Sequence, residues 1–203
     1  MSRVLLVRHG ETELKSSERL WGHTDTKLDA LGLKQAERLR DRLASERIDA
    51  IYSSKLKRAL VTAETIASRH QLEVVTCAEL HEVDFGQLEG LTLSEANQRY
   101  PEVAKLRMQR NLKLKYPGGD SFIEFSKRVS KFLDRLEQHT AEETVLIVAH
   151  NGVLRILFCR LLDIDLRCLW QIHLDLASLS ILETNQQGAI LRLLNDVCHL
   201  TQV

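Results

Sequence analysis

The chain has 203 residues, and its 28 Lys and Arg residues balance 28 Asp and Glu residues, so its formal net charge is zero. Hydrophobic residues make up 44% of the sequence and charged residues 28%, which is typical of a globular protein and excludes a disordered or fibrous one. The balanced charge argues against a nucleic-acid partner, because nucleic-acid binders normally carry a basic excess on one face.

Short apolar runs alternate with amphipathic segments in the first part of the chain. The run Val4–Val7 predicts a strand that is buried on both faces. Apolar residues then recur at helical spacing from Leu33 to Leu43, which predicts a helix with one apolar face. Asp49–Ser53 predicts a second strand, and Ser54 is placed to cap the helix that follows it. Leu72–Cys77 predicts a third strand.

The middle of the chain has little periodicity, and regular order returns after it. Between Glu79 and Gly119 we expect one helix, from Leu93 to Tyr100. An apolar stripe predicts a long helix from about Ser121 to Leu136. Val145–Ala149 is the clearest buried strand of the sequence, and a helix should run from Gly152 to Leu162.

Two further strands are expected at the end, Ser178–Leu182 and Ala189–Leu194. Strands that alternate with helices imply right-handed crossovers between parallel strands. The sequence therefore predicts an α/β fold, a three-layer α/β/α arrangement with a mostly parallel central sheet. We expect residues 1–203 to form a single domain, since the length suits one core and no linker interrupts the pattern.

The sequence shows no membrane or export signal. Its longest apolar run, Val145–Ala149, is far shorter than the roughly 20 residues that span a bilayer. The N-terminus lacks the apolar segment of a signal peptide, so we expect a cytoplasmic protein without a membrane partner. In that compartment the cysteines are expected to be reduced packing residues: Cys77, Cys159, Cys168 and Cys198.

Reactive side chains follow several of the predicted strands. Arg8 and His9 follow the first strand, Arg58 follows the second, and Glu82 comes soon after the third. His150 directly follows the most strongly predicted strand. In open α/β sheets ligands collect outside the carboxyl ends of the strands, so parallel pairing would bring these five side chains together.

Together, these residue types suit the chemistry of a phosphate group. Two guanidinium groups and helix N-terminal amides bind a phosphate dianion. A neutral imidazole is a capable nucleophile, and nearby arginine cations lower its pKa and keep it neutral. Glu82, close to a bound anion, would tend to hold its proton and could act as a general acid.

Taken singly, each of these residues has an ordinary structural explanation. An Arg-His-Gly sequence after a strand is a weak signal, and we expect the six histidines other than His9 and His150 to be structural. Glu11 and Glu89 are expected to be solvated surface charges. The coincidence of four strand ends favours a single phosphate site.

Motifs spread over nearly the whole chain, in a constant order, resemble those of the histidine phosphatase superfamily, in its phosphoglycerate mutase-like branch. The segments that carry the resemblance are Val7–Thr12, Trp21–Asp25, Ser53–Ala59, Leu80–Gly90, Gly118–Ser121 and Val148–Gly152. The resemblance implies that the predicted domain is a histidine phosphatase domain. It implies neither a metal ion nor a cofactor, and no carboxylate or histidine cluster has the spacing of a metal site.

By this resemblance His9 is the nucleophile that becomes phosphorylated, and Arg8, Arg58 and His150 hold the phosphoryl group. Glu82 is the proton donor to the leaving group. The expected substrate-binding residues are Thr12, Lys15, Trp21, Gly22, Asn151 and Gly152.

Lys15 departs from the pattern of the family. Many relatives carry an Asn at this position, and its side chain touches the phosphate. The Lys15 ammonium could reach the same oxygens or could lie in solvent, and the sequence leaves this open.

The number of residues between the acidic residue and the Gly-Gly turn distinguishes the phosphatases of this family from its mutases. Mutases typically carry a longer insert between the acid and the Gly-Gly turn, whereas Glu82 and Gly118 are close together here. The compact chain resembles alpha-ribazole phosphatases, which remove the 5′-phosphate late in cobalamin assembly. Its ending, Leu194–Leu200, is similar to the tails of both that group and the metal-independent phosphoserine phosphatases.

The resemblance thus implies a phosphomonoesterase that forms a phosphohistidine and acts on a small phosphorylated metabolite, most similar to alpha-ribazole 5′-phosphate phosphatase. Alternatives are a phosphoserine or broad-specificity phosphatase, a phosphoglycerate mutase, and a catalytically silent phosphate- or phosphoprotein-binding domain. The segment Leu91–Pro117 either covers the pocket and selects the leaving group or is solvated. Whether the chain forms a homodimer stays open.

Overall fold

The protein is described here by a computed structural model, which covers residues 2–14, 19–185 and 187–201. Its strands form one sheet in the order β3-β2-β4-β1-β5-β6. The first four of these are mutually parallel, whereas β5 and β6 run antiparallel to their neighbours. The strands are β1 (Ser2–Arg8), β2 (Ala50–Ser53), β3 (Val74–Thr76), β4 (Thr144–Ala149), β5 (Leu179–Asn185) and β6 (Gly188–Asp196).

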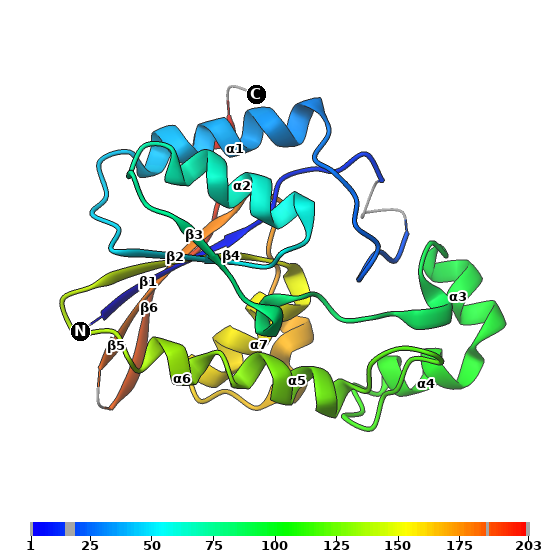
Figure 1. Ribbon diagram of the computed structural model, residues 1–203. Coiled ribbons are helices and arrows are strands. Elements are labelled where there is room, and N and C mark those ends of the chain that lie inside the picture. The colour runs from blue at the N-terminus through cyan, green and yellow to red at the C-terminus, as the bar shows by residue number, and fades with distance from the viewer. Residues whose placement is uncertain (1, 15–18, 186, 202–203) are drawn as a thin grey trace.

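Helices cover both faces of the sheet, which confirms the predicted three-layer α/β/α fold with a mostly parallel sheet. Helices α1 and α2 lie on one face and α5, α6 and α7 on the other, while α3 and α4 lie to one side (Figure 1). The helices are α1 (Ala30–Leu43), α2 (Lys57–Ala67), α3 (Leu93–Arg99), α4 (Pro101–Met108), α5 (Phe122–Ser130), α6 (Leu133–Leu136) and α7 (Asn151–Leu161).

The central strands β1 and β4 contribute side chains to two apolar clusters, one on each face of the sheet. Leu5 and Val7 of β1 pack with α1 and α2, whereas Val4 and Leu6 pack with α5 and α7. Every residue of β4 is buried. Burial on both faces explains why these strands are continuous apolar runs, as predicted, and it makes them a rigid support for the residues that follow them.

The structure corrects three local expectations. Ser54 does not cap α2, because that helix begins after Leu56, whose amide donates to the Ser54 hydroxyl at 3.2 Å. The long helix expected from Ser121 is interrupted, since α5 ends at Ser130 and α6 begins at Leu133. A second helix, α4, follows α3 with Pro101 in its first turn, because proline suits a first helical position but disfavours helical backbone in the residue before it.

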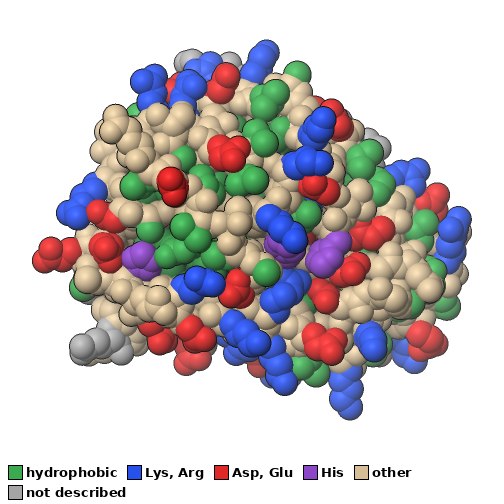
Figure 2. Space-filling model, in the orientation of Figure 1, with side chains coloured by type: hydrophobic (Ala, Val, Ile, Leu, Met, Phe, Trp, Pro, Cys, Tyr) green, Lys and Arg blue, Asp and Glu red, His purple; other side chains and the backbone are tan. Residues whose placement is uncertain are grey.

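The face of the molecule shown in Figure 2 has no strong bias in charge. On the face shown in Figure 2, acidic and basic side chains are interspersed rather than gathered into one basic patch. Among the described residues, no helix has the length and apolar character needed to cross a membrane.

Candidate active site

The carboxyl ends of β1 and β4 place two histidines next to each other. The His9 amide donates to the carbonyl of Ala149 at 3.1 Å, so the ladder between the strands continues one residue beyond β1. The rings of His9 and His150 lie with their centroids 5.1 Å apart and their planes at 61°. Parallel pairing therefore brings the two predicted histidines together, as expected.

His9 is held in a form that suits a nucleophile. Its side chain is buried, and its Nδ1 lies 2.8 Å from the carbonyl oxygen of Gly10. A carbonyl oxygen can only accept, so Nδ1 carries the proton of the neutral ring and Nε2 keeps its lone pair. Burial, followed by the charges of Arg58 and Arg8, holds the pKa of His9 well below its usual value, which keeps the ring neutral.

His150 has the opposite tautomer because of Arg58. The Nε of Arg58 donates to Nδ1 of His150 at 3.2 Å, and a guanidinium can only donate. Nε2 of His150 therefore carries the ring proton, and this nitrogen is buried with no hydrogen-bond partner among the described residues. Burial and the Arg58 charge hold the pKa of His150 well below its usual value. The result is a neutral donor without an acceptor.

Arg58 also fixes the loop that follows β1. Its terminal nitrogens donate to the carbonyl oxygens of Thr24 at 2.8 Å and Gly22 at 2.6 Å. With its bond to His150, these use three of the five N–H groups of the guanidinium and leave two for a ligand. Burial is the largest influence on the pKa of Arg58 and lowers it.

Glu89 clamps the same loop, and its expected role as a solvated surface charge is wrong. Its carboxylate accepts from the amides of Gly22 at 2.9 Å, His23 at 3.1 Å and Thr24 at 3.3 Å. It also accepts from the Thr24 hydroxyl at 2.6 Å and from the amide of Phe85 at 3.2 Å. Glu89 belongs to the Leu80–Gly90 motif, but the sequence carries no sign of the backbone amides that its carboxylate binds.

Arg8 adds a second buried cation. One of its terminal nitrogens donates to the carbonyl of Leu174 at 2.6 Å, while its Nε is buried with no partner among the described residues. Burial lowers the pKa of Arg8 to about 10, so the group stays charged at neutral pH.

Glu82 meets the first turn of α7. Its Oε1 accepts from the amide of Val83 at 2.9 Å, and its Oε2 accepts from the amide of Gly152 at 3.0 Å. A Cβ at Gly152 would lie 2.5 Å from Oε1, so any side chain there would displace the carboxyl. In the structure Gly152 thus holds Glu82, which itself is only 7% exposed.

A cavity of about 160 Å³ opens onto these groups. Its lining residues are Arg8, His9, Thr12, Arg19, Leu20, Trp21, Thr26, Arg58, Glu82, Phe85 and Asn151. Seven of the eleven predicted site residues are therefore on its wall. Gly22, His150 and Gly152 are hydrogen-bonded to the wall residues Arg58 and Glu82, and Lys15 lies outside the described residues.

Sequence reasoning missed four residues of the wall. Phe85 belongs to the recognised Leu80–Gly90 motif, which could have identified it, whereas Arg19, Leu20 and Thr26 carried no distinguishing signal. No described residue from Leu91 to Pro117 lines the cavity. That segment supports the wall instead, through Tyr116, whose ring lies 5.0 Å from that of Phe85, and through the Leu91 carbonyl, which accepts from the Leu20 amide at 2.9 Å.

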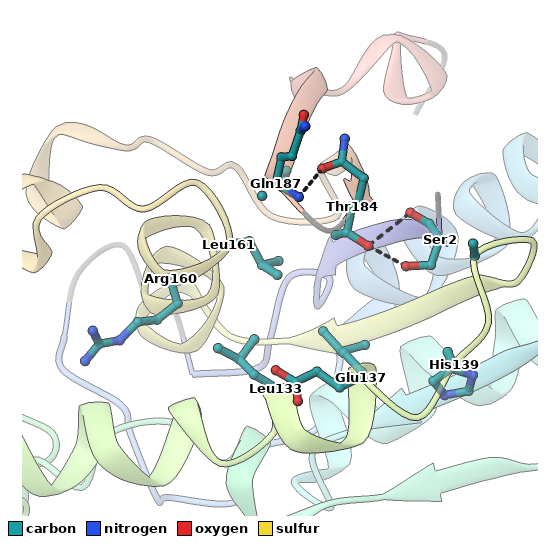
Figure 3. A pocket seen from close by; sticks show the side chains of 13 residues that line it. Ser2, Leu133, Glu137, His139, Arg160, Leu161, Thr184 and Gln187 are labelled. Atoms are coloured by element: carbon teal, nitrogen blue, oxygen red, sulfur yellow. Dashed lines mark hydrogen bonds between the residues drawn. The ribbon is translucent and has the colours of Figure 1, made fainter.

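A larger cavity, of about 930 Å³, lies at the other end of the sheet (Figure 3). Its wall includes Ser2 at the start of β1, Leu133 of α6, Leu161 of α7 and Thr184 of β5. None of the predicted site residues lines it. The smaller cavity is the candidate site, because buried polar groups without partners gather there, and such groups are rare unless a ligand or water satisfies them.

Comparison with known proteins agrees with this geometry. Residues 4–197 match the family model described as "Histidine phosphatase superfamily (branch 1)". The chain is 34% identical to "Phosphoserine phosphatase 1" of Hydrogenobacter thermophilus, over 98% of this chain and 95% of that protein. It is 33% identical to "Adenosylcobalamin/alpha-ribazole phosphatase" of Escherichia coli, over 96% of each. The solved structure of the alpha-ribazole phosphatase from Shigella flexneri is similar, with a TM-score of 0.87 and 34% identity over 96% of both chains.

Proposed function

Since the chain belongs to branch 1 of the histidine phosphatase superfamily, we propose that it hydrolyses small phosphomonoesters through a phosphohistidine formed on His9. The observation that carries this proposal is the pairing of two opposite tautomers. His9 keeps a lone pair on Nε2, while His150 holds out an unpaired N–H in the same site. The first suits attack on phosphorus and the second suits an oxygen of the phosphoryl group.

In the first step Nε2 of His9 attacks the phosphorus atom and the ester P–O bond breaks. The electron pair of that bond goes to the leaving oxygen, which takes the carboxyl proton of Glu82. The products are phosphohistidine, a free alcohol and the carboxylate of Glu82. During this step the guanidinium groups of Arg8 and Arg58 and the Nε2–H of His150 stabilise the negative charge on the phosphoryl oxygens.

In the second step water attacks the phosphohistidine. The Glu82 carboxylate accepts a proton from this water, the P–N bond breaks, and its electron pair returns to His9. Inorganic phosphate leaves, and both His9 and Glu82 are restored. Water consumption and proton transfer balance over the two steps without a further co-reactant.

For the substrate we propose alpha-ribazole 5′-phosphate. Besides the groups proposed to bind phosphate and the polar residues Thr12, Arg19 and Thr26, the wall of the cavity includes Leu20, Trp21 and Phe85, which suit a partly apolar, neutral alcohol. Arg19, which also lines the cavity, is engaged by the Gly90 carbonyl at 2.7 Å and by Glu95 at 3.2 Å. This wall fits a nucleoside-like group better than the zwitterion of serine.

Phosphoserine is the second candidate, supported by the 34% identity to a protein named phosphoserine phosphatase. The test is kcat/KM for alpha-ribazole 5′-phosphate, phosphoserine and p-nitrophenyl phosphate, measured with EDTA present. We expect release of inorganic phosphate from all three and the highest value for the first. A higher value for phosphoserine would reverse the order of the two candidates, and phosphate binding without release would contradict hydrolysis itself.

A further inference from the structure

A third arginine, Arg155, interacts electrostatically with Glu82 and is not among the residues that line the cavity. Arg155 is on α7, one turn beyond Gly152, whose amide donates to Glu82 at 3.0 Å. Residues three or four apart share one face of a helix, so Arg155 lies on the face of α7 that carries Asn151 and Gly152. Its Nε is buried, and no described residue hydrogen-bonds to that atom.

The charges around this guanidinium point to the carboxyl of Glu82. Burial lowers the pKa of Arg155, and Glu82 is the charged group that acts in the opposite direction. Burying a cation without a partner is unfavourable, so a compensating negative charge is expected nearby. A Cβ on Gly152 would lie 2.5 Å from Oε1 of Glu82, so the face of α7 that Arg155 shares with Gly152 points toward this carboxyl, and Glu82 is the carboxylate that favours the charged form of Arg155.

Groups from four parts of the fold interact electrostatically with Glu82. Arg8 comes from β1, Arg58 from α2, Arg155 from α7, and Tyr116 from the loop before α5. Burial raises the pKa of Tyr116 to about 12, so this phenol is neutral at physiological pH. Arg8 and Arg58 line the cavity and donate hydrogen bonds to described residues. Arg155 does not line the cavity, and no hydrogen bond joins its guanidinium to a described residue.

We propose that Arg155 is a positioning residue that stabilises the Glu82 carboxylate as it forms during catalysis. The inference rests on the proposed function. Glu82 is neutral before it protonates the leaving oxygen and negatively charged afterwards, and the Val83 and Gly152 amides hold it in a buried place. A fixed cation behind the carboxyl favours the state in which the proton has left, so it acts more on the transition state than on the ground state.

This role makes the effect of Arg155 depend on the leaving group. An alkoxide needs the proton of Glu82, whereas a nitrophenolate is stable without it. Arg155→Gln should therefore lower kcat for ribose 5-phosphate by about 10- to 100-fold, the range expected for one charge acting across a partly buried distance. The kcat for p-nitrophenyl phosphate should change little, and KM should change little for both substrates. Arg155→Lys keeps the charge and should restore most of the ribose 5-phosphate rate.

The experiment compares these variants with Arg160→Gln as the matched control. Arg160 is on the same helix, but it is exposed and its Nε donates to Ser130 at 3.1 Å. A double-mutant cycle with Glu82→Gln completes the test, because no carboxylate forms there and Arg155→Gln should add no further loss. The control should keep the wild-type rates on both substrates.

Equal loss on both substrates, a fully additive loss in the double variant, or failure of Arg155→Lys to restore the rate would each overturn the inference. Wild-type protein that hydrolyses neither substrate would instead overturn the proposed function, and the inference with it. A substitution that merely altered the folded state would lower the rates on both substrates equally. That result would overturn the inference.

Discussion

The Nε–H of Arg58 donates to Nδ1 of His150 at 3.2 Å, and this bond determines which nitrogen of His150 is free to donate. The same guanidinium holds the carbonyl oxygens of Gly22 and Thr24. Arg58 therefore fixes a tautomer of His150, orders the loop after β1 and has two further N–H groups that a ligand could use.

Arg58→Lys should not be a conservative change. A lysine ammonium cannot make the forked set of bonds to His150 and the loop at once. We expect kcat/KM for p-nitrophenyl phosphate to fall by about 10²- to 10³-fold, comparable to the loss of a transition-state hydrogen-bond donor. The ¹⁵N resonances of His150 should report a shift in the population of its tautomers. Wild-type kinetics in this variant would remove Arg58 from the phosphate site.

Acidification should destabilise the folded protein before carboxylates are protonated. His9 and His150 have folded-state pKa values well below the ordinary value of 6.5, so below pH 6.5 the unfolded chain binds protons that the folded chain does not. The free energy of unfolding should then fall by up to about 1.4 kcal/mol per pH unit for each histidine. Above pH 6.5 these two groups should contribute no pH dependence.

Urea unfolding at pH 7.5, 6.0 and 5.0 measures this slope. His150→Gln removes one titrating group and should flatten the slope relative to the wild type. An equal slope in the two proteins would show that His150 is not buried in its neutral form.

Glu89→Ala should destabilise the protein and impair the site together. The substitution leaves the amides of Gly22, His23 and Thr24 without their acceptor, and unsatisfied groups cost about 1–3 kcal/mol each when buried. We expect the free energy of unfolding to fall by about 2–4 kcal/mol, because water can satisfy some of these half-buried groups. Urea unfolding checks this value, and Glu102→Ala on the exposed side of α4 is the control. If the two variants were equally stable, Glu89 would not clamp the loop.

Gly152→Ala should displace the carboxyl of Glu82, since a Cβ there would lie 2.5 Å from its Oε1. Turnover of alkyl phosphates should drop by about 10²- to 10⁴-fold, the contribution typical of general acid catalysis, and p-nitrophenyl phosphate should lose much less. Glu82→Gln should give the same pattern. A variant that hydrolyses alkyl phosphates at the normal rate would contradict the assignment of Glu82 as the acid.

The strands and the residues at their ends could be predicted because burial on both faces leaves a continuous apolar run. β1 and β4 are such runs, so the positions of His9 and His150 followed from the sequence and from the sidedness of parallel sheets. Glu89 could not be recognised as a clamp, because its partners are backbone amides of a loop that is distant in sequence.

Other features depend on contacts that periodicity does not record. The apolar stripe after Ser121 continues past Ser130 although the helix does not, since Lys131 and Phe132 keep right-handed helical backbone angles and Phe132 stays buried. Arg155 lies at ordinary helical spacing from Gly152, but only the folded structure shows that its Nε is buried and that no described residue hydrogen-bonds to it.

The central claim is that His9 carries the phosphoryl group between the two steps. Rapid chemical quench with ³²P-labelled p-nitrophenyl phosphate tests it most directly, because a good leaving group makes the first step fast and lets the intermediate accumulate. The account predicts acid-labile, base-stable label on His9, on the order of one phosphate per active site, and neither label nor turnover in His9→Ala. Substantial hydrolysis by His9→Ala, or release of phosphate from the wild type with no labelled protein at any quench time, would contradict it.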